Sequence, residues 1–88
     1  MKHQIAMFKF TLGAQQSIGP TQLQALWAHA CQSPNVSVGR EEDRGSGRAT
    51  YALYAPQQLQ DLHQVEQRLR EALERNMLRA SLIPLHAL

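Results

Sequence analysis

Three acidic residues in a row, Glu41-Glu42-Asp43, are the densest group of potential acid-base or metal-binding side chains in this 88-residue chain. Paired carboxylates can move protons in a reaction or bind a hard metal ion. Their neighbours, however, are Arg44, Gly45 and Gly47, which are typical of a turn. Because carboxylates at the tip of a turn are mostly hydrated, we expect a solvent-exposed hairpin loop here rather than a site.

Cys31 and the four histidines are the other side chains that could bind a metal or act as nucleophiles. A single cysteine excludes an internal disulfide and a multi-cysteine metal site, and no Lys or Arg lies near Cys31 in the sequence to stabilise a thiolate. We therefore expect a buried, unreactive thiol. Only His3 and His86 could meet, in neighbouring strands, and two ligands make a weak metal site. We expect no cofactor and no metal.

Short motifs that would identify an enzyme are absent from the sequence. Gly45 and Gly47 lie between two predicted strands, whereas a phosphate-binding glycine loop leads from a strand into a helix. Neither a Gly-x-Ser-x-Gly nor a His-Glu-x-x-His motif occurs. The sequence therefore predicts a protein that is not an enzyme.

Alternation of apolar and polar residues predicts four strands that position these side chains. The predicted strands are residues 5–12, 35–40, 48–55 and 77–85. In the first, Ala6, Phe8, Phe10 and Leu12 share the side that we expect to face the core. The last contains Pro84, and because proline is nearly confined to sheet edges and strand ends, we expect this strand at an edge.

Two segments have the apolar spacing of amphipathic helices, residues 21–33 and 57–76. Pro20 suits the first turn of the first helix, because its missing N–H would have no partner there. Both predicted helices open on a similar motif, Gln22-Leu23-Gln24-Ala25-Leu26 and Gln58-Leu59-Gln60-Asp61-Leu62. The chain therefore resembles two related halves.

The order strand, helix, strand, strand, helix, strand predicts one domain, residues 1–88, with an α+β, ferredoxin-like βαββαβ fold. Such a sandwich has a four-stranded antiparallel sheet with two helices on one face, and its first and third strands are central. The predicted core consists of Phe8, Phe10, Leu23, Leu26, Trp27, Cys31, Leu62, Leu69 and Leu73. A winged helix that touches DNA with the hairpin is the competing fold, but it needs three helices before the hairpin.

The sheet face without helices is the predicted binding surface, because it combines apolar and basic side chains. The candidate binding residues are Ile5, Met7, Lys9, Arg48, Tyr54, Arg79 and Ile83. The pattern leaves open whether the third strand exposes Tyr51 or Tyr54. A plain hydrated sheet face is the interpretation without function.

Two functions fit this surface. The first is protein contact, as a homodimer or by docking on a larger complex as an accessory subunit, chaperone or inhibitor. An apolar patch and a second strand without proline, around Val36 and Val38, favour it. The alternative is binding of single-stranded RNA or DNA, with bases stacked on an aromatic ring and Lys9, Arg48 and Arg79 at phosphates.

Composition limits the classes of partner. The formal net charge of +2 is too small for bulk charge alone to drive nucleic-acid binding. Lys9 and Thr11 interrupt the apolar start of the chain, so we expect neither a signal peptide nor a membrane partner, and a cytoplasmic location.

Overall fold

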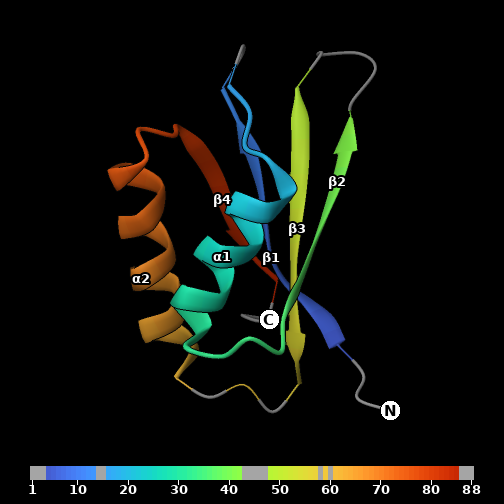
Figure 1. The fold of residues 1–88 in the computed structure, drawn as a ribbon, viewed down its shortest axis with the longest axis vertical. Coiled ribbons are helices and arrows are strands. Elements are labelled where there is room, and N and C mark those ends of the chain that lie inside the picture. Colours follow the sequence, from blue (N-terminus) through green and yellow to red (C-terminus); the bar gives the residue numbers. More distant parts are fainter. Residues whose placement is uncertain (1–3, 14–15, 43–47, 58, 60, 86–88) are drawn as a thin grey trace.

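A computed structural model describes residues 4–13, 16–42, 48–57, 59 and 61–85 (Figure 1). Its elements follow the predicted order: β1 (Gln4–Leu12), α1 (Pro20–Cys31), β2 (Ser37–Glu42), β3 (Ala49–Pro56), α2 (Leu62–Arg75) and β4 (Ala80–Pro84). The sheet order is β2-β3-β1-β4, and all neighbouring strands are antiparallel. This topology confirms the ferredoxin-like α+β fold.

The side chains of β1 that face the helices form the centre of the core. Phe8, Phe10 and Leu12 are each at most 1% exposed. The Phe8 ring packs edge to face against Trp27 of α1, with the ring centres 5.7 Å apart. The Phe10 ring stacks on Tyr51 of β3, with the ring centres 5.0 Å apart. The predicted orientation of both phenylalanines is therefore confirmed.

Helix α1 begins where proline allows it and ends at a left-handed residue. Pro20 occupies the first turn after Gly19. The last helical residue is Cys31, two residues earlier than predicted, and Gln32 with φ of 53° caps this end. The predicted apolar stripe of α1 is buried against the sheet. Trp27 also donates its indole N–H to the carbonyl of Tyr54 at 2.9 Å, which fixes α1 on β3.

Helix α2 begins later than the apolar spacing predicts. The predicted start at residue 57 is wrong, because the helix begins at Leu62, after Asp61 in a left-handed conformation with φ of 56°. The second copy of the repeated motif therefore leads into the helix rather than opening it, and its Gln58 and Gln60 lie outside the described residues. Leu62 is half-buried against the core, whereas Leu69 and Leu73 are buried as predicted.

Strand β2 extends further into the hairpin than predicted. Glu41 and Glu42 belong to the strand, paired with Thr50 and Ala49, and are not part of the loop. Asp43 and the turn glycines lie outside the described residues. Strand β2 has only β3 as a neighbour, so it forms one edge of the sheet.

Strand β4 forms the other edge, as predicted from Pro84, and it ends at that residue, one position earlier than predicted. It begins at Ala80, three residues later than expected. Within the described part of the chain, no helix is both long and apolar enough to cross a membrane.

Candidate binding surface

Both helices lie on the same side of the sheet, and no described element covers the opposite side, which is called the uncovered face below (Figure 1). Antiparallel partners point to the same side, so the register decides which side chains this face carries. Lys9 pairs with Ala52 and Ile83, and Thr11 pairs with Thr50 and Ser81. The uncovered face consists of Ser37, Gly39, Glu41, Thr50, Ala52, Tyr54, Ala6, Lys9, Thr11, Ser81 and Ile83.

A β-bulge at Met7 changes the composition of this face. Ala6 pairs with Tyr54 and Phe8 pairs with the next residue, Leu53, so Met7 is an extra residue in β1. Its side chain is 2% exposed and belongs to the core. The prediction that Met7 lies on the uncovered face is therefore wrong.

The same bulge exchanges the two faces in the first residues of β1. Ala6, which was expected in the core, lies opposite Tyr54 on the uncovered side. Ile5 lies opposite Ala55, a fully buried residue on the helix side, yet is itself 41% exposed. The prediction that Ile5 belongs to the uncovered face is therefore also wrong.

The two tyrosines of β3 have separate roles. Tyr51 is 1% exposed, and its hydroxyl accepts the backbone N–H of Ile18 at 3.3 Å. Tyr54 lies on the uncovered face, with its ring over Gly39: a Cβ added to Gly39 would be 3.4 Å from that ring. Tyr54 therefore provides the one aromatic ring that the described residues place on this face.

Small residues, Gly39, Ala52 and Ala6, alternate with larger ones across the middle of the face. One row across the sheet runs Gly39, Ala52, Lys9, Ile83, and the next contains Tyr54 and Ala6. Ile83 is 58% exposed, which is high for a large apolar side chain. Ile83 and Tyr54 are thus the large apolar groups of the face, and Lys9 lies between them.

The two predicted arginines lie at one end of the face. Arg48 and Arg79 both line a cavity of about 280 Å³ at the end of β1, together with Thr11 and Ser81. The hydroxyl oxygens of Thr11 and Thr50 are 3.3 Å apart and share a hydrogen bond. Of the seven residues predicted for the surface, the structure therefore brings five to the face and its end: Lys9, Arg48, Tyr54, Arg79 and Ile83.

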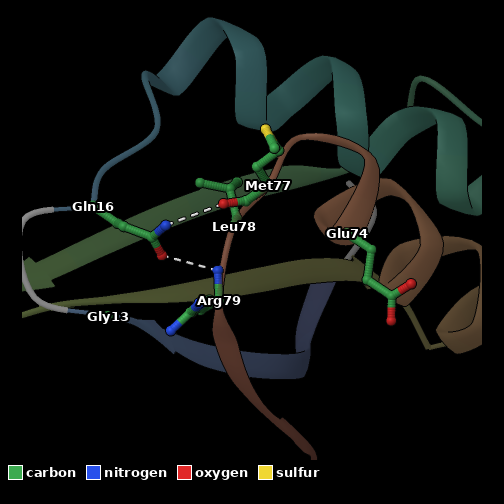
Figure 2. A pocket seen from close by; sticks show the side chains of 6 residues that line it. All are labelled: Gly13, Gln16, Glu74, Met77, Leu78 and Arg79. Atoms are coloured by element: carbon green, nitrogen blue, oxygen red, sulfur yellow. Dashed lines mark hydrogen bonds between the residues drawn. The ribbon is translucent and has the colours of Figure 1, made fainter.

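Gln16 positions Arg79, which the sequence did not indicate. Figure 2 shows the Gln16 side-chain amide between two backbone groups: it donates to the carbonyl of Met77 at 3.1 Å and accepts the N–H of Arg79 at 2.9 Å. The Arg79 carbonyl in turn accepts the N–H of Gly13 at 3.0 Å. These residues line an adjoining open cavity of about 720 Å³ with Glu74. Hydrogen bonds therefore hold the backbone of Arg79 on both sides.

A smaller apolar hollow of about 210 Å³ lies between the start of α1 and strand β2. Ile18, Leu23 and Val38 line it, and the Arg40 guanidinium lies 6.0 Å from the centre of the Tyr51 ring. The hollow is on the helix side of the sheet. It is therefore separate from the uncovered face.

Cys31 is buried, as predicted. Burial raises the pKa of its thiol from 9.0 to about 12, because desolvation disfavours the thiolate more than the nearby Arg68 charge favours it. Arg68 belongs to α2, and its Nε donates to the carbonyl of Ala30 at 2.8 Å. A basic group therefore does lie near this thiol, although none is near it in the sequence.

We expect Cys31 of the native protein to resist alkylation. At pH 8 a pKa of about 12 instead of 9.0 lowers the thiolate fraction about a thousandfold. Iodoacetamide labelling followed by mass spectrometry should therefore be far slower for the native protein than for the urea-unfolded chain at the same pH. The pKa of the Cys31 thiol is higher in the folded protein than in the unfolded chain. The thiol therefore contributes to the free energy of unfolding below pH 9, and this contribution is lost as the pH rises from 9 to about 12. Equal labelling rates for both states would contradict the burial.

The remaining potential metal ligands that the structure describes do not come together. His29 and His63 are exposed on the two helices, and His3 and His86 lie outside the described residues. In the ranges that the structure describes, no three His, Cys, Asp or Glu side chains are placed to hold a metal ion.

Comparisons with known protein families, with curated proteins and with solved structures found no match for this chain. The ferredoxin-like topology hosts many unrelated functions. The uncovered face and its arginine-lined end are therefore the features from which a function can be argued.

Proposed function

We propose that the protein is a non-enzymatic binding module that contacts another protein through the uncovered face of its sheet. The observation that supports this proposal is Ile83, which is 58% exposed on a face that also displays Tyr54. Protein interfaces combine a central apolar and aromatic patch with a polar rim. Here Ser37, Glu41 and Ser81 would form that rim.

A second copy of the chain is the simplest partner, because the face fits itself. A two-fold axis that runs along the strands, between β3 and β1, would place β2 of one copy opposite β4 of the other. Ile83 would then lie over Gly39 of the second copy, and Tyr54 over Ala6. Each large group would meet a small one, and Glu41 would meet the hydroxyl of Ser81. Docking on a larger complex would use the same residues.

The proposal is tested by the mass of the protein in solution and by one substitution. We expect a dimer in light scattering at micromolar concentration, and Ile83→Asp should weaken it on the order of thirtyfold or more, because an unpaired carboxylate would be buried in place of an apolar contact. Met77→Asp is the matched control, because Met77 is 84% exposed but lies outside the face. A monomer at every concentration, or equal loss with Met77→Asp, would contradict self-association.

Single-stranded nucleic acid is the second candidate, and the cavity between Arg48 and Arg79 favours it. The burial of Tyr51 weakens it, because sheets that bind RNA stack bases on two or three rings. Fluorescence anisotropy with a labelled single-stranded oligonucleotide separates the candidates. Nucleic-acid binding predicts an affinity that falls steeply with salt and with Lys9→Ala, whereas the dimer predicts no oligonucleotide binding.

A further inference from the structure

Lys9 and Glu41 are the charged side chains that the described strands place on the uncovered face. Both are exposed, and neither side chain makes a hydrogen bond or salt bridge to the residues that the structure describes. Strand β3 lies between β1 and β2, so the two groups are two strands apart within one copy (Figure 1). At a strand spacing of about 4.8 Å, only fully extended side chains would bridge that separation.

Lys9 lies in the middle of the face, between apolar groups. Its cross-strand partners are Ala52 on one side and Ile83 on the other. A partner that covers Ile83 therefore also covers Lys9. Burying an ammonium group without a counter-charge offsets much of what the apolar contact contributes. A partner that fits this face well therefore presents a carboxylate near Lys9.

The face-to-face dimer proposed above supplies that carboxylate. Its two-fold axis runs along the strands, so it keeps the rows of both sheets in step and places β2 of one copy over β4 of the other. Glu41 then lies over Ser81 of the second copy. In that second copy, Ser81 is one strand and one row away from Lys9. The carboxylate and the ammonium are therefore diagonal neighbours across the interface.

Two further features favour this pairing. Ala52 is the residue that lies directly over Lys9 in the dimer, and its small side chain leaves room for the lysine to turn toward Glu41. Arg79 lines a cavity with Ser81, on the side away from Lys9. A carboxylate over Ser81 therefore has a basic group on each side. Such complementary charges fix the register of an interface and exclude wrong partners.

We propose that Lys9 and Glu41 form two symmetric ion pairs between copies and thereby select a second copy of this chain as the partner of the uncovered face. This inference rests on the proposed function, and it names the residues that decide which protein binds. Because a two-fold axis makes every contact twice, one substitution alters both ion pairs.

Charge reversal tests this inference. Lys9→Glu and Glu41→Lys should each weaken self-association on the order of a hundredfold, since each places two pairs of like charges in the interface. An equimolar mixture of these two variants should recover the dimer, because both contacts then join opposite charges. The double variant Lys9→Glu, Glu41→Lys should likewise dimerise with itself. Light scattering gives the mass of the assembly, and native mass spectrometry identifies the mixed dimer.

Glu74→Lys is the matched control, because Glu74 is exposed on α2, on the other side of the sheet. It changes the net charge as Glu41→Lys does, yet it should recover Lys9→Glu no better than the wild-type protein. An unchanged dimer in either reversal, no recovery on mixing, or equal recovery with Glu74→Lys would overturn the ion pairs and leave the dimer intact. A wild-type monomer would contradict the dimer itself, and this inference with it.

Discussion

Replacing Met7 with aspartate should remove most of the stability of the fold, whereas the same change at Lys9 should leave it nearly unaltered. Met7 is 2% exposed and Lys9 lies on the uncovered face. Burying a carboxylate without a partner, and losing an apolar side chain, together cost several kcal/mol. A domain is stable by only about 5–15 kcal/mol, so the loss would be a large part of the total. Urea unfolding followed by circular dichroism measures it.

This pair of substitutions tests the β-bulge directly, because strict alternation would give Met7 and Lys9 the same surroundings. Met7→Leu is the matched control, and its cost should stay below about 1.5 kcal/mol because the volume is nearly conserved. Equal tolerance of aspartate at both positions would mean that β1 is regular and that Met7 is on the surface.

Trp27→Ala should cost about 3–5 kcal/mol in the free energy of unfolding, as expected for the removal of a fully buried aromatic side chain. Trp27 is 0% exposed and packs edge to face on Phe8. It also donates its indole N–H to the carbonyl of Tyr54. Guanidinium unfolding followed by far-UV circular dichroism measures the change without depending on tryptophan fluorescence.

Trp27→Phe divides this effect into packing and hydrogen bonding. The ring is partly kept, but the partly buried carbonyl of Tyr54 loses its donor, for which we expect about 1 kcal/mol. A loss of stability for Trp27→Phe as large as that for Trp27→Ala would show that the hydrogen bond dominates. A cost near zero for both would contradict the position of Trp27 at the centre of the core.

The sheet order could be predicted from the sequence because a few residues carry strong constraints. Pro84 restricts the last strand to an edge, and the polar residues Lys9 and Thr11 mark one side of β1. The bulge could not be predicted in the same way. Residues 5–8 are all apolar, so no polar residue marks the point where the alternation shifts by one position.

The start of α2 was predicted too early for a related reason. Leu59 packs against the core, so it adds to an apolar spacing that appears helical, although it lies outside the helix. The turn depends on Asp61 in a left-handed conformation, which aspartate tolerates better than most residues. Apolar periodicity does not record such a turn.

The candidate surface was predictable where it follows strand alternation beyond the bulge, as for Lys9 and Ile83. The choice between Tyr51 and Tyr54 needed the register of the pairing with β1. Gln16 could not have been found, because its partner Arg79 is 63 positions away and glutamine in a loop has no distinctive pattern. Contacts of that kind are a product of the tertiary fold.

The Gln16 amide also links two connections that are distant in the sequence. It joins the segment that leads into α1 to the turn between α2 and β4. A displacement of Arg79 would therefore pull on the chain before Pro20 as well as on Met77. Together with the bond from the Gly13 N–H to the Arg79 carbonyl, this side chain couples the position of Arg79 to the segment that leads into α1.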